Sequence, residues 1–390
     1  MPFAAAPASV SAKESLRRAF DLCIAKTRSN IRALADHPAA WAHAANGRYP
    51  EWKEGFMEIG NWTSSFFTGM ALLAWRETGD GHFLRQAVRL EPFYQTKLRE
   101  HAADTMHDLG FLYSLYAVAL HKLTGESRYR DLGLHAARVL ADRFIPQGGY
   151  LRAWGRMDRP DSDYAGLAII DTMMNLPLLH WASDQSGDPC YREIAIRHSD
   201  TTLRHFIRPD DSIYHCYRFD LAEGTPLCGE NYGGRDVESH WARGSSWAAY
   251  GFALGYRHTG DSRYLDVSLR LARRFVFLLD TELVPYWDFR LDPEAPQIRD
   301  SSAAAVAVCA FQELESAGAA EPAIMAAKQA LLARLCSDAY LDFDPAVEGV
   351  LKHGEVGDGV GNAKSAYTSW GDYFLMEALA RETGNKETWW

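Results

Sequence analysis

Apolar stretches of helical length recur along the chain, and the same short turn closes each of them. Residues 71–77 form an apolar stretch that is typical of a helix, and Thr78-Gly79-Asp80 follows at once. Glycine accepts the left-handed backbone that ends a helix, and the acid after it can cap the next helix. The pattern returns as Thr124-Gly125-Glu126, Ser186-Gly187-Asp188 and Thr259-Gly260-Asp261, and in degenerate form as Thr383-Gly384-Asn385.

An aromatic residue three positions after the acid, such as Phe83 after Asp80, can pack the new helix against the old one. The gap between Gly260 and Gly384 is long enough for one more unit, and Ala317-Gly318-Ala319 falls inside it. A helix pair cannot bury its apolar face alone, so successive pairs must pack on one another. Six pairs can stack into an open solenoid or close into a double-layered α/α toroid.

The apolar pattern favours closure. Residues 247–254 combine bulky apolar side chains with isolated polar ones, as expected for an inner helix, whereas an open solenoid would need polar capping ends. Short β-like pieces such as residues 212–217 then belong to loops at one rim, around a central cleft. No inter-domain linker is evident, so we expect an all-α fold with residues 1–390 in one domain.

The overall composition limits the classes of partner. The formal net charge of −10 argues against nucleic acid, because phosphate binding needs a basic surface. No apolar run approaches the roughly 18 residues of a membrane span. The 12 Trp, 18 Tyr and 18 Phe supply many rings, which either stack on sugar faces or pack the core. Nothing in the composition indicates an oligomeric state.

The N-terminus and the cysteines indicate the compartment. The segment that begins Met1-Pro2-Phe3 has no basic start, and its apolar stretch is too short for a secretory signal. The six cysteines form no Cys-x-x-Cys pair and no zinc spacing. We therefore expect reduced thiols in a cytoplasmic protein, and neither a metal nor another cofactor.

The strongest chemical signal is a pair of aspartates inside apolar runs. Asp108 lies in residues 106–113 and Asp171 in residues 167–176. A carboxylate among Ile, Leu, Met and Phe loses hydration, which raises its pKa, and two carboxyls in different settings are the usual arrangement for general acid and base catalysis. The chain has no Gly-x-Ser-x-Gly elbow, phosphate-binding glycine loop, dinucleotide fingerprint or His-Glu-x-x-His motif. We therefore place the active site at the two aspartates.

Each aspartate also has a purely structural interpretation. Asp108 follows Thr105 by three residues and could be the acid of a capping box, while Asp171 could be an N-cap in a packed joint. A helix N-terminus would favour the anion at Asp108, whereas apolar neighbours favour the neutral acid at Asp171. We therefore expect Asp171 to be the proton donor.

Further candidates are a histidine, an arginine and three tryptophans. His215 follows a turn and is either structural or a ligand of the substrate. Arg243 lies near Trp247 at the start of a helix, where the two could form a sugar platform with an anion-binding arginine or a packed helix entry. Trp62 and Trp154 lie at expected edges between loops and helices.

These residues resemble those of glycoside hydrolase family 88, the unsaturated glucuronyl hydrolases. The likeness extends from about Trp62 to the C-terminal region and is most specific in residues 107–115 and 169–179. Residues 286–289, 299–303 and 370–373 also match in kind. The resemblance implies an (α/α)6 barrel, in agreement with the repeat. It also implies a small oligosaccharide substrate, left by a polysaccharide lyase, that ends in a 4,5-unsaturated uronic acid.

The resemblance implies a reaction as well. Asp171 matches the general acid/base that protonates C4 of the C4=C5 double bond, after which water adds at C5 and the resulting hemiketal opens, breaking the glycosidic bond. Asp108 would orient the sugar and help to hold the protonation state of Asp171. His215 matches a substrate-binding histidine, and Trp62 and Trp247 match aromatic positions that line the site.

Some stretches depart from the family pattern. Residues 243–247 are Arg-Gly-Ser-Ser-Trp where the family commonly has Arg-Gly-Gln-Ala-Trp, and a family His-Gln pair is replaced within residues 230–235. A glutamine that contacts substrate is therefore expected to be missing, which concerns fine specificity more than the reaction. In the loop 359–365, where relatives differ in tolerating sulfated sugars, Lys364 could pair with a sulfate or be an exposed rim lysine.

Three other functions stay open on this evidence. Asp108 disfavours an unsaturated rhamnogalacturonyl hydrolase of the related family 105, because an acid at this position is characteristic of the glucuronyl branch. A sugar epimerase on the same toroid would need histidines as acid and base, and the paired aspartates disfavour it. A non-catalytic carbohydrate-binding barrel would bind a sugar without consuming it. The parent polysaccharide, its sulfation and its linkage are not indicated.

Overall fold

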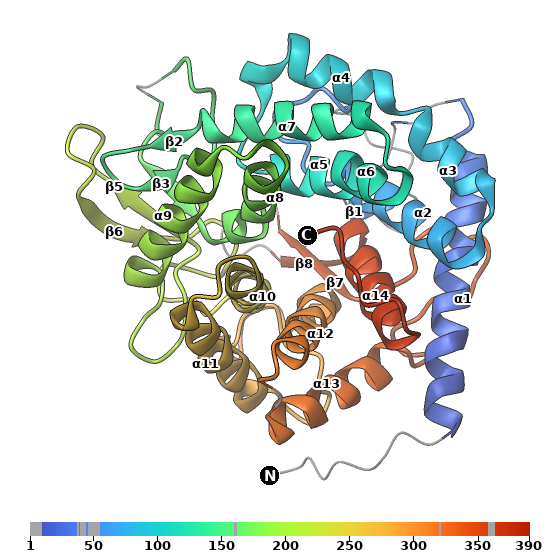
Figure 1. The fold of residues 1–390 in the computed structure, drawn as a ribbon. Helices are drawn as coiled ribbons and strands as arrows, with labels where there is room; N and C mark the ends of the chain where they lie inside the picture. The colour runs from blue at the N-terminus through green and yellow to red at the C-terminus, as the bar shows by residue number, and fades with distance from the viewer. Residues whose placement is uncertain are drawn as a thin grey trace.

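The helices form two concentric rings (Figure 1). The computed structural model describes residues 10–36, 39, 44–45, 55–159, 162–319, 321–357 and 363–390. The inner ring contains α2 (Ser64–Thr78), α5 (Leu109–Tyr113), α6 (Ala119–Thr124), α8 (Leu176–Ser186), α10 (Ala242–Thr259), α12 (Ser301–Ser316) and α14 (Ser369–Glu382). A π-helical turn (Ser114–Val118) joins α5 directly to α6, and the two act as one segment of the ring. The outer ring contains α1 (Val10–Ala33), α3 (Gly81–Val88), α4 (Glu91–Glu100), α7 (Ser127–Ala141), α9 (Pro189–His205), α11 (Ser262–Leu278) and α13 (Pro322–Leu335). Two 3₁₀ turns, Ala102–Asp104 and Ile170–Met174, precede α5 and α8.

Contacts between neighbouring inner helices run around the whole ring. α2 packs on the α5–α6 segment, this segment on α8, and α8 on α10, followed by α12 and α14. α14 packs back on α2, and α1 contacts both of them. Inner helix α12 is buried on all sides from Ser301 to Leu314, whereas the outer helix α11 buries one face. The fold is therefore an (α/α)6 barrel, and the prediction of a closed toroid is confirmed.

The predicted glycine turns end the inner helices. The backbone angle φ is positive at Gly79, Gly125, Gly187, Gly260, Gly318 and Gly384. Glycine populates this left-handed region without the steric penalty that other residues meet. The turn at Gly318 joins α12 to α13, which confirms the extra helical hairpin predicted from the long gap.

The acids after these glycines cap the next helix in three of four cases. Asp80, Asp188 and Asp261 each accept a hydrogen bond from the amide two residues further on, at 2.8–2.9 Å. The capping prediction is wrong for Glu126, which makes no side-chain capping bond. Its longer side chain pairs instead with Arg128 Nε at 2.8 Å.

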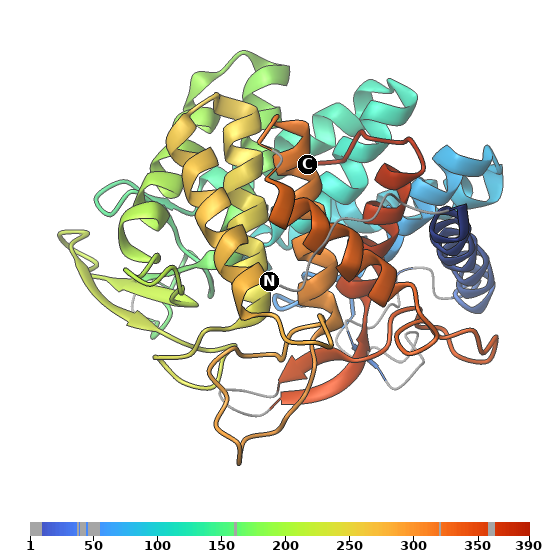
Figure 2. The same cartoon turned by 90° about the horizontal axis from the view of Figure 1, so that it is seen from below.

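The larger sheets lie toward one end of the toroid (Figure 2). One antiparallel sheet contains β4 (Leu167–Ile169), β5 (Cys216–Phe219) and β6 (Pro226–Glu230). The other has the order β1 (Ala44–Ala45), β8 (Ala363–Thr368), β7 (Gly354–Gly357), and a separate pair joins β2 (Phe144–Ile145) to β3 (Tyr150–Leu151). The predicted β piece at residues 212–217 is only partly strand, because β5 begins at Cys216.

The last four residues cross the opposite end, where the C-terminus lies at the centre of the ring (Figures 1 and 2). Arg257 on α10 donates to Thr388 Oγ1 at 3.2 Å. The Trp390 ring stacks on Phe374 with centroids 5.9 Å apart, and its Nε1 donates to Glu377 Oε2 at 2.8 Å. The tail thus fills the axis of the barrel from the side away from the strands.

All six cysteines carry unpaired thiols. Cys23, Cys216, Cys309 and Cys336 are buried, and Cys190 and Cys228 are exposed. No disulfide therefore links any two of the six cysteines in this structure. Among the described helices, none combines the length and the apolar character needed to cross a bilayer.

Buried neutral histidines lead to a prediction about acid stability. Burial lowers the pKa of His180, His198 and His240 to about 3, whereas an unfolded histidine titrates near pH ~6.5. Between these values the unfolded chain binds more protons, so the free energy of unfolding falls with falling pH, by up to about 1.4 kcal/mol per pH unit for each histidine. The raised pKa values of Asp171 and Glu355 act in the opposite direction.

We expect the histidines to dominate, because burial also lowers the pKa values of His107, His215 and His258. These six histidines outnumber the three acids whose pKa values burial raises, Asp108, Asp171 and Glu355. The midpoint of thermal unfolding should therefore drop steeply as the pH is lowered below about 6.5. Calorimetric scans across this range check the prediction. A midpoint that stays constant down to pH ~4 would contradict it.

Candidate active site

Asn175 holds the two aspartate segments together. Its Nδ2 donates to the Asp171 carbonyl at 3.1 Å, and its Oδ1 accepts from the Phe111 amide at 2.7 Å. Gly110, two residues after Asp108, lies so close that an added Cβ would be 2.4 Å from the Asn175 Cα. The proximity of the two carboxyls therefore depends on a close backbone approach between α5 and Asn175, the residue just before α8.

The substitution Gly110→Ala should disturb both carboxyls. The new methyl group has no room against the Asn175 backbone, and overpacking typically costs about 1–3 kcal/mol. A displacement of reacting groups by about 1 Å can cost about 10²-fold in rate, so we expect a lower melting temperature and a kcat reduced by about that factor.

Thermal unfolding and steady-state kinetics with the substrate proposed below measure both effects. Gly255→Ala on α10 is the control, because its nearest non-local atom, on Tyr264, would be 3.3 Å from the new Cβ. This variant should keep its kcat. An unchanged kcat in Gly110→Ala would show that the approach at Asn175 does not set the positions of the carboxyls.

A cavity of about 230 Å³ opens beside the two carboxyls. It is lined by Gly60, Trp62, Met106, His107, Asp108, Trp154, Ile169, Asp171 and His215. Five of the residues predicted from the sequence therefore share one site, both aspartates included. The Ile170 amide donates to the His215 carbonyl at 3.0 Å, which extends the pairing of β4 with β5 and places Asp171 beside His215.

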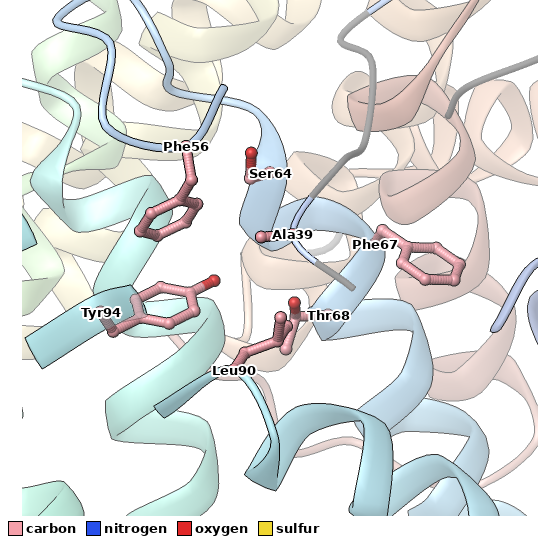
Figure 3. Close-up of a pocket in the computed structure, with 7 residues that line it drawn as sticks. All are labelled: Ala39, Phe56, Ser64, Phe67, Thr68, Leu90 and Tyr94. Atoms are coloured by element: carbon pink, nitrogen blue, oxygen red, sulfur yellow. The ribbon is translucent and has the colours of Figure 1, made fainter. Parts of the chain in front are cut away.

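A second cavity is too small for a sugar. Its volume is about 10 Å³, and it is lined by Ala39, Phe56, Ser64, Phe67, Thr68, Leu90 and Tyr94. The hydroxyl groups of Thr68 and Tyr94 point toward the same small space (Figure 3). This is about the smallest space that holds one water molecule. A third cavity, of about 300 Å³, is lined by charged and polar side chains such as Glu315, Lys328 and Arg381 and contains neither aspartate. The cavity beside the two carboxyls is therefore the candidate active site.

Asp171 has a carboxyl oxygen without a hydrogen-bond partner. Oδ2 is buried, and the His215 Nε2 lies 3.8 Å from it. The side chain keeps 14% of its surface exposed and lines the cavity. Burial raises the pKa of Asp171 to about 7, against the opposing charge of Arg243. Near neutral pH much of this carboxyl is therefore protonated, in agreement with the neutral acid expected from its apolar neighbours.

The alternative interpretation of Asp108 as a helix cap does not hold. It stands at the N-cap position of α5, but its side chain makes no capping hydrogen bond. Burial, followed by the charge of Asp171, raises the pKa of Asp108 well above its usual range, while the Arg143 charge lowers it. The prediction that a helix N-terminus favours the Asp108 anion is therefore wrong, because the carboxyl makes no bond to the helix amides and lies near a second acid.

His107 links the two aspartate segments and was not predicted as a site residue. Its Nδ1 lies 3.1 Å from Thr172 Oγ1, and its Nε2 lies 3.3 Å from Asp108 Oδ1. Burial lowers the pKa of His107 well below its usual value, so the ring is neutral. When the Thr172 hydroxyl donates to Nδ1, the remaining N–H faces Asp108. The position of His107 directly before Asp108 in an apolar run was the signal that could have found it.

Arg143 is a second residue that was not predicted. Its buried guanidinium donates hydrogen bonds of 2.8–3.2 Å to four backbone carbonyl groups, those of Thr105, Arg152, Ala153 and Gly155. These bonds hold the segment before Asp108 to the loop that carries Trp154. The Asp108 charge favours the charged form of Arg143, although burial lowers the pKa of Arg143 to about 9. No motif marks this arginine, because its partners are backbone groups.

His215 presents a fixed N–H to the cavity. Its Nδ1 accepts a hydrogen bond from the Tyr232 amide at 2.9 Å, so the proton of the neutral ring is on Nε2, which faces Asp171. Burial lowers the pKa of His215 to about 3. The Trp241 ring packs on the imidazole with centroids 4.6 Å apart. His215 is therefore a neutral, oriented hydrogen-bond donor.

Two tryptophan rings line the cavity. Trp62 is stacked on Trp370 with centroids 4.9 Å apart. Trp154 makes an edge contact with Tyr232 at the same centroid distance, 4.9 Å. Both rings are thus held by a second aromatic ring, which limits the rotamer freedom that binding a sugar would otherwise remove.

Two other predicted residues lie away from the cavity. Trp247 has no exposed surface and packs in the aromatic core between Phe111 and Phe374. Lys364 is exposed on β8, and residues 359–362 of the same predicted loop lie outside the described residues. The structure therefore does not bring Trp247 or Lys364 to the carboxyls.

Arg243 is not part of the cavity lining but lies beside it, with 9% of its side chain exposed. Its guanidinium carbon is 4.7 Å from the centroid of the Trp241 ring and 5.4 Å from that of Trp370. These two rings pack on His215 and Trp62, which line the cavity. The Arg243 charge also lowers the pKa of His215, so its field reaches the site.

The arrangement is suited to donating a proton to a bound sugar. It combines an acid that titrates near neutral pH, a second buried carboxyl, a neutral imidazole donor and two supported rings. Within the described part of the chain, no three His, Cys, Asp or Glu side chains converge in a way that could hold a metal ion.

Known proteins share this chain's sequence and fold. The family model described as Glycosyl Hydrolase Family 88 matches residues 28–258. The unsaturated glucuronyl hydrolase of Bacillus sp. (strain GL1) is 37% identical over 337 residues, which cover 85% of this chain and 88% of that protein. The unsaturated chondroitin disaccharide hydrolase of Streptococcus pyogenes serotype M1 is 32% identical over 383 residues, which cover 97% of this chain and 94% of that protein. The crystal structure of the Bacillus sp. GL1 enzyme matches with a TM-score of 0.87 and 34% identity, over 96% of this chain and 99% of that chain.

Proposed function

The chain belongs to glycosyl hydrolase family 88 and is a glycoside hydrolase, and we propose that it releases a 4,5-unsaturated uronic acid from lyase-generated oligosaccharides of the glycosaminoglycan type. The observation that carries the proposal is the Asp171 carboxyl, which lines the cavity with one oxygen unpartnered and a pKa of about 7. An acid with a pKa near the working pH is suited to proton transfer in a transition state. The activities for which the two relatives are named, unsaturated glucuronyl hydrolase and unsaturated chondroitin disaccharide hydrolase, support the substrate class.

The proposed reaction begins with transfer of the Asp171 proton to C4 of the C4=C5 double bond. The Asp171 carboxylate then takes a proton from a water molecule as that water adds to C5, which restores the acid. The C5 hemiketal opens to a ketone, and the hemiacetal left at C1 breaks into an aldehyde and the free partner sugar. One water molecule is consumed, and Asp171 ends in its starting state.

The other side chains bind and orient the sugar in this proposal. Asp108, whose pKa is also raised, accepts or donates to a ring hydroxyl and is held beside His107. His215 donates from Nε2, and Trp62 and Trp154 stack on sugar faces. Arg243 attracts the uronate carboxylate. Trp247 supports the core behind the site, and Lys364 is the rim cation that would meet a sulfate.

Ultraviolet absorbance tests the proposal. Unsaturated disaccharides from lyase digestion, sulfated and unsulfated, are incubated with the protein while the absorbance of the conjugated acid is followed. We expect the absorbance to disappear in proportion to release of the partner sugar. Absorbance that persists on all of these disaccharides, with the protein folded, would overturn the proposal. If absorbance were lost only with an unsaturated rhamnogalacturonyl substrate, the protein would be an unsaturated rhamnogalacturonyl hydrolase instead.

The proposal extends to the organisation of the chain and to its compartment. Residues 1–390 would form one catalytic domain, since contacts close the ring from α1 to α14.

A cytoplasmic location is supported by the free thiols of all six cysteines, because disulfides are rare in that compartment. Fractionation of the native cells, with detection of the protein by antibody, tests the location.

A further inference from the structure

Arg243 has one acidic neighbour more than its single charge can balance. Its Nη1 donates to Asp300 Oδ2 at 2.6 Å, to Glu355 Oε2 at 3.0 Å and to the Glu355 carbonyl at 3.1 Å. Both acids are buried, with 0% and 1% of their surface exposed. The described residues offer no hydrogen-bond acceptor to Nη2 or Nε of Arg243.

The two acids differ in how well their anions are stabilised. Asp300 Oδ1 accepts from the Ser302 and Ala303 amides at the start of α12 and from the Glu355 amide, at 3.0–3.3 Å. A helix N-terminus stabilises an anion, so Asp300 is the resident counter-ion of Arg243. Glu355 has no comparable set of amide donors, and burial raises its pKa to about 7.

The charge of this cluster decides whether a further anion can bind. With Glu355 ionised, one guanidinium faces two carboxylates, and a uronate would be a third anion at a buried site. With Glu355 protonated, the cluster is neutral, and Nη2 and Nε remain to bind a carboxylate in the bidentate manner that arginine favours. Buried charges interact more strongly than charges in water. Binding of the anion and protonation of Glu355 must therefore favour each other.

We propose that Glu355 is a specificity-determining residue that takes up a proton when the substrate's uronate binds at Arg243. The affinity for the unsaturated substrate then weakens as the pH rises. This inference rests on the proposed function, because it requires an anionic sugar at Arg243. The charged groups that face Glu355 are Arg243 from α10 and Asp300 from the start of α12, and its partner on β8 is the non-titrating Ser365.

Separate measurement of KM and kcat between pH ~5.5 and ~8.5 tests the role of Glu355. In the unmodified protein KM should rise above pH ~7, approaching tenfold per pH unit. In Glu355→Gln, which keeps the shape and removes the charge, KM should stay low and independent of pH. The loss of kcat at high pH, caused by Asp171, should persist in both. Glu321→Gln, a change in an exposed ion pair with Arg273, is the matched control.

A KM that does not change with pH in the unmodified protein, or a KM that changes equally in Glu355→Gln, would overturn the inference. Both results are distinguishable from a failure of the proposed function. If the proposed function were wrong, no disaccharide would lose its absorbance at any pH. Turnover with a KM independent of pH leaves the hydrolase intact and removes only the role of Glu355.

A binding experiment tests the inference without changing Glu355. Calorimetry of an unsaturated disaccharide with Asp171→Asn, in two buffers of different ionisation enthalpy at pH ~7.5, measures proton uptake. We expect uptake of about 0.5–1 proton for each bound disaccharide. The methyl ester of the same uronic acid should take up none, because it brings no charge to Arg243. Equal uptake with the ester would point to Asp108 instead and would overturn the inference, as would no uptake with the acid.

Discussion

Replacement of Asp171 by asparagine should reduce kcat by about 10²–10⁴-fold, the usual contribution of a general acid. The amide keeps the shape of the carboxyl but cannot donate a proton to a carbon atom. The same chemistry predicts that kcat of the unmodified protein falls above pH ~7, because the pKa of Asp171 is about 7 and the acid is deprotonated there. Absorbance loss of the unsaturated acid measures both effects.

The fold of Asp171→Asn should survive. The carboxyl is buried, and its Oδ2 has no hydrogen-bond partner, so the neutral amide removes a charge that burial disfavours. The melting temperature should therefore be equal to or higher than that of the unmodified protein. Asp131→Asn, at an exposed position on α7, controls for the change of side chain. Undiminished kcat in folded Asp171→Asn would remove Asp171 from the mechanism.

Replacement of Trp390 by alanine should have the largest effect on stability among the predictions. The residue is buried, with 3% of its surface exposed, and its ring stacks on Phe374 and donates to Glu377 at the barrel axis. Truncation of a buried tryptophan to alanine typically costs about 3–5 kcal/mol, through lost burial and the cavity that remains. Urea unfolding monitored by circular dichroism measures the difference in free energy of unfolding.

Two further variants separate the causes of this loss. Trp390→Phe keeps a ring on Phe374 but removes the donor to Glu377, so it should cost less than Trp390→Ala. Phe277→Ala removes a ring that is 76% exposed and should change stability by no more than about 0.5 kcal/mol. A Trp390→Ala protein as stable as Phe277→Ala would mean that the tail does not hold the barrel end together.

Features set by local chemistry were predictable from the sequence. The turn glycines were found because a left-handed backbone is needed at each helix end, and Gly318 was found from spacing alone. The aspartyl caps follow from the reach of a short side chain, and the same reasoning failed at Glu126, whose side chain is one methylene longer. The apolar run around Asp171 correctly indicated a buried carboxyl.

Features set by distant parts of the chain were not predictable. Asp108 was expected to be favoured as an anion by its own helix, but burial by the folded chain, followed by the charge of the distant Asp171, raises its pKa. The partners of Arg243 come from the start of α12 and from β7, which no local pattern near Arg243 identifies. Trp247 was misplaced for the same reason. Its position near the start of a helix suggested a place in the site, but packing against distant helices turns its ring into the core.

The packing of α14 between α12 and α2 has a consequence for how the chain is made. Of the helices of the barrel, α14 is synthesised last, and the inner ring closes only when α14 packs on α12 and α2. Until then α2 and α12 each lack a neighbour, so apolar helix surface stays in contact with solvent throughout synthesis. Such exposed surface is the usual cause of aggregation and of chaperone binding. A nascent chain arrested before α14 should therefore be a chaperone client, and release of that one helix should end the dependence.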